Sequence, residues 1–405
     1  MKATALREAI ASELEENLLP FWRERSVNHA CGGFVGEMAS DGTVHQDAPQ
    51  GLILNSRLLW TFASLYRHLG DGRDLELAQR AFDTLQSRFH DRENGGYFWL
   101  VDAQGQPLIS SKKTYGQAFC VYALSEYSLA TDEPAALDAA RELFGLIERH
   151  AHDEAFGGYI EARAVDWSTA PDLRLSNKDM DVAKSMNNHL HLLEAFTTLY
   201  RAWPDSGVGS RLDELVTIFG RHIISRDAGN RHLNHFFDEG WNLRSDTYTY
   251  GHDIEAAWLL CEAADVLGDD ELIATVRLWA IDLARTTLAQ AIDADGGLAY
   301  EGRGGEVINP GRDWWCQAEA VVGFWHAYGL TDDPAFAEAA VRIWQFIDRH
   351  LVDRAHGEWF WGLRADGTVD ETEPKVSEWK GPYHTVRMCL EMMRRLNESA
   401  IGEKA

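Results

Sequence analysis

The sequence lacks the features that tie proteins to membranes or to nucleic acid. No apolar run approaches the roughly 18 residues that a membrane-spanning helix needs. Basic residues are scarce, with 38 Lys and Arg against 64 Asp and Glu, and the net charge is −26. This balance disfavours nucleic acid, anionic membrane surfaces and phosphorylated substrates as partners. The first 22 residues carry acids where a signal peptide has its apolar core, so no export is expected.

Cysteine is also rare, and none of it stands in a CxxC pair. Five scattered thiols exclude a disulfide framework and predict reduced, mostly buried side chains in a cytoplasmic protein. Tryptophan, in contrast, occurs 15 times, more than packing alone requires. Indole rings facing a cleft make good platforms for the apolar faces of ligands. The cysteines are Cys31, Cys120, Cys261, Cys316 and Cys389.

A short glycine-aromatic marker such as "RENGGYFWL" recurs six times, at intervals of 61 to 74 residues. An Asp or Asn precedes most markers by four positions, and Arg231 takes the glycine place in the fourth. Six copies indicate six structural repeats. The markers stand at Gly32, Gly95, Gly157, Arg231, Gly296 and Gly357.

Between the markers, each repeat contains one apolar and one charged, amphipathic helical pattern. This alternation predicts an inner ring of buried helices wrapped by an outer ring with one wet face. We expect an all-α (α/α)6 barrel, formed by residues 1–405 as one domain, with the markers as short strands or turns at one end. An open superhelical array is the alternative, but the last helix is too apolar for a polar cap. The apolar ranges are 52–69, 113–130, 183–201, 250–267, 314–329 and 382–397; the charged ranges are 4–25, 74–90, 134–150, 209–224, 271–290 and 334–350.

Polar and aromatic residues stand near the start of each apolar helix, at spacings that follow the repeat. In such a barrel they converge on one end of the axis and line a single pocket. In 183–201, Asn187, His191 and Glu194 share one helical stripe, whereas His189 faces away and is expected to be structural. With no HExxH motif and no closely spaced ligand pair, no metal is expected. The converging residues are Arg57, Tyr115, His191, His252, Trp315 and His384.

Four segments resemble signatures of the cellobiose 2-epimerases, a branch of the N-acylglucosamine 2-epimerase superfamily of (α/α)6 barrels. They are "KSMNNHLHLLEAF", "YGHDIEAAWLL", "WWCQAEAVVGF" and "EWKGPYHTVRMCLE", and the resemblance runs from Asn55 to Glu391. The aldose–ketose isomerases of the superfamily typically carry Pro-Gly-His where this chain has Tyr250-Gly251-His252. The family commonly has Thr at Asn188 and Cys or Asn around Gly381 and Thr385, which leaves the preferred substrate length open.

The resemblance implies cofactor-independent 2-epimerisation of the reducing-end glucose or mannose of β-1,4-linked disaccharides such as cellobiose, lactose or mannobiose. By the same resemblance, His191 and His384 exchange the C2 proton and His252 manages ring opening and closure. Arg57 binds the O1/O2 edge, and Trp315 and Trp379 stack on sugar rings. A monomer is implied. Residues implied to bind hydroxyls or tune the imidazoles are Tyr115, Asp179, Asn187 and Glu255. Glu194 and Glu255 each stand three residues after a histidine and are expected to orient His191 and His252.

The residues themselves suit this chemistry. Opening a sugar ring needs an acid and a base, and histidine serves as either near neutral pH. Loss of the C2 hydrogen gives an enediolate that a guanidinium stabilises. Inversion returns the proton to the other face, which two histidines on opposite inner helices can do.

Other functions stay open at this point. The same enediolate serves a D-mannose 2-epimerase or an aldose–ketose (mannose) isomerase. An inverting glycoside hydrolase would use two carboxylates among Asp253, Glu255 and Glu319, and a non-catalytic glycan-binding protein would need only the tryptophans.

Overall fold

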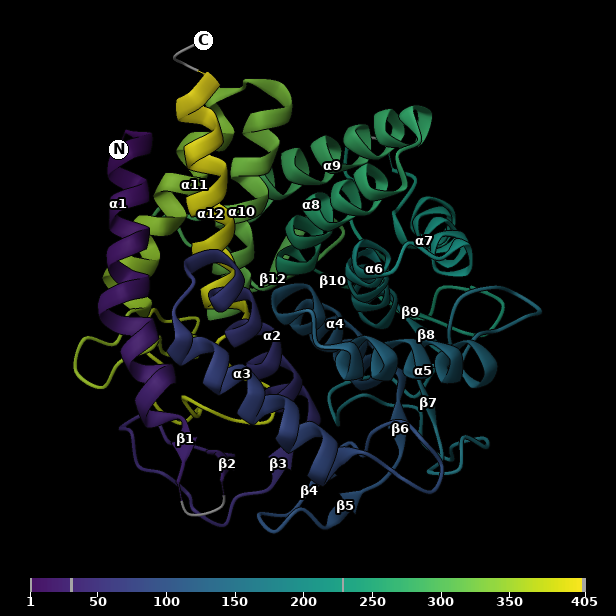
Figure 1. The fold of residues 1–405 in the computed structure, drawn as a ribbon. Helices are drawn as coiled ribbons and strands as arrows, with labels where there is room; N and C mark the ends of the chain where they lie inside the picture. Colours follow the sequence, from purple (N-terminus) through teal and green to yellow (C-terminus); the bar gives the residue numbers. More distant parts are fainter. Residues whose placement is uncertain (1, 30–31, 228, 403–405) are drawn as a thin grey trace.

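Six apolar helices form the inner layer of the fold (Figure 1). The computed structural model describes residues 2–29, 32–227 and 229–402, so the expectation for Cys31 lies outside the described residues. The other four cysteines are buried free thiols, as predicted. Nearly every residue in the first three turns of each inner helix is buried, which explains the lack of an apolar-polar alternation there. The inner helices are α2 (Leu52–Leu69), α4 (Thr114–Thr131), α6 (Met186–Ala202), α8 (Tyr250–Leu267), α10 (Trp314–Thr331) and α12 (Tyr383–Gly402).

Six amphipathic helices form the outer layer. Five of them begin after an acidic residue whose side chain accepts a backbone N–H of the first turn, which satisfies donors that the helix leaves free. Short turns join them to the preceding inner helix, and four outer helices continue into π-helical turns before the next marker. The outer helices are α1 (Ala3–Glu13), α3 (Gly72–Thr84), α5 (Pro134–His150), α7 (Ser206–Ile218), α9 (Asp270–Gln290) and α11 (Pro334–Phe346).

The inner helices close into a ring. Each contacts the next in sequence order, and α12 contacts both α10 and α2. The first outer helix, α1, packs beside α12, as Figure 1 shows at the purple and yellow ends of the chain. The all-α (α/α)6 barrel is therefore confirmed, and the open array is wrong. The predicted helix ranges hold to within three residues when the π-helical turns are counted with the outer helices, except that α12 runs on to Gly402. These turns are Leu14–Leu18, Phe21–Arg25, Leu85–Phe89, Phe219–Ile223 and Ile347–Leu351.

Short antiparallel strands join neighbouring repeats at the end of the barrel where the inner helices begin. In five cases the strand that precedes an inner helix pairs with the strand that follows the next marker, and a bridge between Met38 and Val376 completes the circle. The strands are thus the expected β segments at one end. They are β1 (Val27–Asn28), β2 (Gly33–Phe34), β3 (Gln50–Gly51), β4 (Leu100–Val101), β5 (Pro107–Ile109), β6 (Lys112–Lys113), β7 (Ala162–Arg163), β8 (Lys184–Ser185), β9 (Phe236–Phe237), β10 (Tyr248–Thr249), β11 (Glu301–Arg303), β12 (Glu306–Asn309), β13 (Arg312–Asp313) and β14 (Gly362–Leu363).

The markers fix the start of each inner helix. In the second marker, one carboxylate oxygen of Asp91 accepts N–H groups of its own turn, and the other binds Lys112, two residues before α4. Similar ion pairs join Asp153 to Lys184, Asp293 to Arg312 and Asp353 to Lys375. Each pair anchors the strand or segment that leads into an inner helix.

The fourth residue of an inner helix makes a second link between the helix and the marker before it. His189 accepts the backbone N–H of Tyr159 at 2.9 Å, and Gln117, Asp253 and Gln317 accept the corresponding N–H in their repeats. The expected structural role of His189 is confirmed, and Asp253 is likewise occupied by the fold. Gly158, at φ +74°, passes so close that a Cβ would lie 2.6 Å from His189 Nε2, so the marker needs glycine there.

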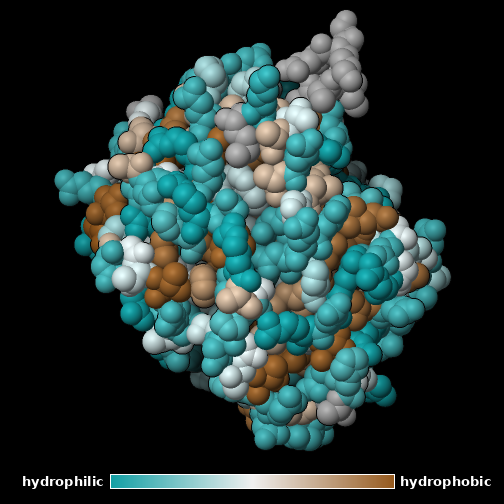
Figure 2. All heavy atoms as spheres, turned by 90° about the vertical axis from the view of Figure 1, so that its left-hand side faces the viewer, coloured by the Kyte–Doolittle hydropathy of each residue, from teal (hydrophilic) through white to brown (hydrophobic). Residues whose placement is uncertain are grey.

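The outer surface is polar. Figure 2 shows the side that carries α1, where hydrophilic residues cover most of the face and apolar ones are scattered among them. Within the part of the chain that the structure describes, no helix is both long and apolar enough to cross a bilayer.

Candidate active site

The barrel contains a cavity at each end. The one where the inner helices begin measures about 320 Å³ and is lined by Asp179, Asn187 and His252, among others. The one at the opposite end, about 530 Å³, contains none of the three predicted histidines. Many of its charged groups pair with one another, as Arg201 does with Glu262. Of the predicted site residues, Asp179, Asn187 and His252 line the first cavity, and the others are placed by their contacts with one another.

His191 and His384 come from α6 and α12, which lie opposite each other in the ring of six. Nδ1 of His191 lies 3.0 Å from a carboxylate oxygen of Glu194, and Nδ1 of His384 lies 2.7 Å from Glu319. A carboxylate accepts only, so each ring carries its hydrogen on Nδ1. Among the described residues no side chain binds Nε2 of either ring, which leaves both free as bases.

These two rings are unprotonated at neutral pH. Burial lowers the pKa of His384 to about 3, against the smaller opposing effect of Glu319. Burial also lowers the pKa of His191, although Glu194 opposes it. Burial alone would raise the pKa of Glu194, but the charge of Arg387 and the bond from His191 bring it to about 2. The site therefore combines neutral imidazoles with ionised carboxylates, the state that acid–base catalysis requires.

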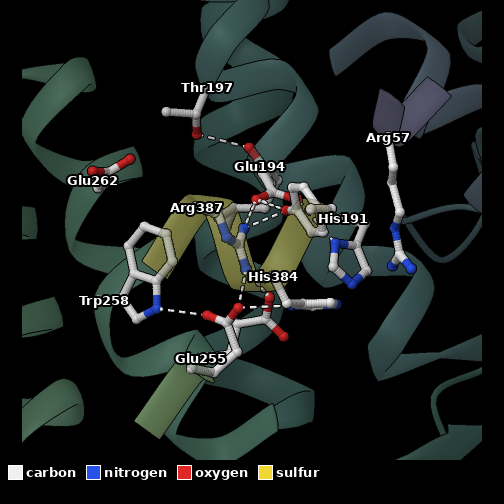
Figure 3. A network of polar contacts seen from close by, with 12 residues as sticks. Arg57, His191, Glu194, Thr197, Glu255, Trp258, Glu262, His384 and Arg387 are labelled. Carbon is white, nitrogen blue, oxygen red and sulfur yellow. Dashed lines mark hydrogen bonds and ion pairs between the residues drawn. The ribbon is translucent and has the colours of Figure 1, made fainter. Parts of the chain in front are cut away.

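Arg387, one turn after His384, joins the two histidine–carboxylate pairs (Figure 3). Its guanidinium donates to Glu194 and to Glu255 in short contacts, and to Glu319 at 2.6 Å. Its side chain is only 2% exposed. The single cation balances carboxylates from α6, α8 and α10 at the bottom of the site, where they would otherwise repel one another.

Arg57 and Tyr115 complete the other side of the site. The Arg57 guanidinium donates to the Tyr115 hydroxyl at 3.1 Å and to the backbone carbonyl of Trp379 at 2.8 Å. The Tyr115 ring packs edge-on against His191, with centroids 5.1 Å apart. Trp379 lies 6.4 Å from Tyr115 by the same measure. This places the predicted guanidinium, one imidazole and one indole on the same side of the site.

His252 and Trp315 form the adjoining wall. Their ring centroids lie 4.6 Å apart, and Trp315 lies 5.8 Å from His384. Burial and the neighbouring histidines, including His191 and His384, hold the pKa of His252 well below its usual value. These contacts bring the predicted aromatic, histidine and arginine residues close together, and their roles in a reaction stay a prediction.

Two details differ from the sequence interpretation. The converging residues are not at equivalent helix positions: Arg57 and His191 lie in the second turn, whereas Tyr115, His252, Trp315 and His384 lie in the first. The idea that Glu255 orients His252 is wrong, because Glu255 binds Arg387 instead. The same i,i+3 spacing does join His191 to Glu194 in α6. In α8 it leaves Glu255 directed toward the barrel axis, where Arg387 of α12 contacts it.

The remaining predicted residues are Asn187, Asp179 and Glu255, of which the first two line the cavity. The side-chain oxygen of Asn187 is buried and has no hydrogen-bond partner among the described residues. Asp179 lies on the loop before α6, where its carboxylate accepts from the backbone and hydroxyl of Ser176. Glu255 is fully buried, and burial together with Glu319 raises its pKa well above the usual value.

Sequence reasoning missed Arg387, and it gave Glu319 a role only in a hydrolase. The signal was present in the sequence. Arg387 stands three residues after His384 in the mostly apolar first half of its helix, and Glu319 stands in a mostly apolar helix. Buried charges of this kind need partners. Glu255, Glu319 and His384 are also close enough to hold a metal ion, but the Arg387 guanidinium contacts both carboxylates and already supplies the positive charge.

These features define an (α/α)6-barrel protein whose inner helices bring three buried histidines together near one end. The chain belongs to the N-acylglucosamine 2-epimerase (GlcNAc 2-epimerase) family, whose model matches residues 32–387. It is 41% identical to a cellobiose 2-epimerase of Bacteroides fragilis over 96% of this chain and 98% of that one. The structure of cellobiose 2-epimerase from Spirochaeta thermophila superposes with a TM-score of 0.91 at 38% identity, over 98% of each chain. A D-mannose isomerase of Marinomonas mediterranea is 25% identical over 90% of this chain and 92% of its own.

Proposed function

We propose that the protein is a carbohydrate 2-epimerase that inverts C2 of the reducing-end glucose or mannose in β-1,4-linked disaccharides. The observation that carries the proposal is the pair of unprotonated imidazoles, His191 and His384, on opposite inner helices. The high identity to cellobiose 2-epimerases over the full length supports the substrate class.

In this proposal the reaction begins with ring opening at His252. His191 or His384 then removes the C2 hydrogen of the open-chain aldose through its free Nε2. The developing enediolate lies beside the Arg57 guanidinium and near the N-terminal ends of six inner helices, both of which favour negative charge. The second histidine returns a proton to the opposite face of C2, and the ring closes.

The carboxylates behind the histidines stabilise the imidazolium that forms on either side. Glu194 and Glu319 each accept the Nδ1 hydrogen, so a ring that gains a proton on Nε2 has a counter-charge in contact. Arg387 keeps both carboxylates ionised. Tyr115, Asp179 and Asn187 would bind sugar hydroxyls, and Trp315 and Trp379 would stack on sugar rings.

Aldose–ketose isomerisation is the second candidate, because the family relatives include a D-mannose isomerase. The same enediolate gives a ketose when the proton is delivered to C1 instead of C2. This chain has Tyr250 where the isomerases of the superfamily typically carry Pro before Gly-His, which favours epimerisation.

Product analysis in D₂O tests the proposal. Cellobiose, lactose, mannobiose, mannose and glucose are incubated with the protein, and every product is identified by NMR. We expect the C2 epimer of a disaccharide, with deuterium at C2 of the recovered aldose. A ketose as the sole product would replace this function by isomerisation, and free glucose from cellobiose would replace it by hydrolysis.

A further inference from the structure

Of the three histidines in the site, His252 is the only one whose Nδ1 does not contact a carboxylate. Its partner is the hydroxyl of Thr249, the last residue of β10 and the cap of α8, at 2.5 Å. Behind Thr249 lies His235, which is only 9% exposed. All three side chains line the 320 Å³ cavity. His252 therefore has a different electrostatic environment from His191 and His384.

The backbone determines the hydrogen position on His235. The backbone N–H of Thr249 donates to Nε2 of His235 at 3.1 Å, so this nitrogen is an acceptor and the ring carries its hydrogen on Nδ1. Burial lowers the pKa of His235 to about 4, which keeps the ring neutral. The Thr249 hydroxyl oxygen lies 3.4 Å from the same Nε2. The hydroxyl has the two ring nitrogens as its partners, and when it shares the His235 Nε2 acceptor with the backbone N–H, its oxygen accepts the hydrogen of His252 Nδ1.

We propose that Thr249, backed by His235, is a positioning residue that holds His252 in the tautomer with hydrogen on Nδ1. The hydrogen bonds then run from His252 Nδ1 to Thr249 Oγ1 and from the Thr249 hydroxyl to His235 Nε2. Nε2 of His252 is left as a base that faces the cavity. This inference rests on the proposed function for its chemical consequence, but the tautomer itself is a property of the free protein.

The hydrogen-bonded chain His252–Thr249–His235, called the relay below, suits a reaction in which one nitrogen takes a proton and then returns it. In ring opening, His252 Nε2 takes the proton from O1–H, the electrons of the O–H bond form the C1=O1 bond, and the C1–O5 bond breaks. The same Nε2–H then protonates O5, so His252 ends as it began. Ring closure is the reverse.

A neutral relay also limits how long His252 keeps the proton. The titratable groups around it are His235, His191 and His384, with the Trp315 ring on the remaining side. Among the described residues no carboxylate contacts a ring nitrogen of His252, in contrast to His191 and His384. His252 therefore returns its proton quickly to the sugar, whereas the other two rings can store the C2 proton.

The test combines NMR with two substitutions at Thr249 and one control substitution at Thr114. Thr249→Val keeps the shape and removes the hydroxyl, Thr249→Ser keeps the hydroxyl, and Thr114→Val removes a buried hydroxyl that binds only the Ile160 carbonyl. In protein labelled with ¹⁵N-histidine, the His252 signals are assigned by their loss in His252→Gln. We expect Nδ1–H in the wild type and Thr249→Ser, and a shift toward Nε2–H in Thr249→Val.

Kinetics provide the second measurement. We expect kcat for epimerisation to fall about 10- to 100-fold in Thr249→Val with little change in KM, less than the roughly 10²–10⁴-fold that an acid–base group itself contributes, because Thr249 only positions that group. Thr249→Ser should recover most of the rate, and Thr114→Val should keep it. An Nε2–H tautomer of His252 in the wild type, or a Thr249→Val protein with unchanged tautomer and rate, overturns the inference. If the wild type epimerises no sugar, the proposed function fails, while the tautomer measurement still tests the relay.

Discussion

At the scale of single residues, the site depends on one buried arginine. Arg387 contacts Glu194, Glu255 and Glu319, each at most 3% exposed. Removing one partner of a buried ion pair leaves an uncompensated charge and typically costs about 3–5 kcal/mol. Arg387→Met should therefore lower the free energy of unfolding by about that amount, measured by urea denaturation.

The same helix provides the control. Arg394 is 40% exposed, and two carboxylates that it contacts, Glu391 and Glu262, also contact Arg395. Its loss therefore leaves neither carboxylate without a cation, and the cost should be that of a surface pair, about 0–1 kcal/mol. Arg394→Met should stay within that range. Equal losses in the two variants would show that Arg387 is not the charge on which the three carboxylates depend.

The lowered histidine pKa values predict the pH dependence of activity. A histidine acts as a base only when unprotonated, and its protonated fraction rises as pH falls through its pKa. The pKa of His384 is about 3, and those of His191 and His252 lie below the ordinary 6.5. The three rings therefore stay unprotonated, and can act as bases, at lower pH than an ordinary histidine. We expect the acid limb of kcat/KM to have an apparent pKa below 6.5, measured at constant ionic strength.

Acid unfolding has to be separated from this effect. Protein held at the acid pH and returned to neutral pH should recover full activity. An acid limb at or above 6.5, the ordinary histidine value, would contradict the electrostatics described for the site.

At the scale of elements, the marker turns and the inner helices act together. Lys112, with no exposed side-chain surface, pairs with Asp91 just before α4 begins. Lys112→Met leaves the Asp91 carboxylate buried and should cost about 3–5 kcal/mol of unfolding free energy. Tyr115 lies three residues further on, so activity should also fall. Denaturation curves and kcat/KM together check this.

An exposed pair at another marker is the matched comparison. Arg364 binds Asp370 with 49% of its side chain exposed, and Arg364→Met should change stability by no more than about 1 kcal/mol. If Lys112→Met lowers the free energy of unfolding no more than Arg364→Met does, the marker pairs do not anchor the inner helices.

At the scale of the whole molecule, the repeat made the fold predictable. Six markers and two kinds of helix leave few arrangements, and the apolar character of the last helix, 382–397, correctly favoured closure over an open array. The convergence of His191, His252 and His384 followed from that closure. The fold could be predicted because the periodic pattern of apolar residues indicates both the helices and their burial.

The polar network could not be derived in the same way. Which carboxylate meets which cation depends on side-chain direction across the barrel, so Arg387 had no role in the sequence interpretation, and Glu255 was assigned to the wrong neighbour. The partner of His252 is Thr249, three residues before it but outside the helix. Helical spacing describes contacts on one helix face, not those between six helices.

Hydrogen exchange at C2 tests the central claim, that His191 and His384 act on opposite faces of the sugar, most directly. The variants His191→Asn and His384→Asn are each incubated in D₂O with cellobiose and, separately, with its C2 epimer. The account predicts that neither variant interconverts the sugars at an appreciable rate, while each incorporates deuterium at C2 of only one epimer, a different one in each variant. Interconversion at the wild-type rate in either variant, or exchange of both epimers by one of them, would contradict it.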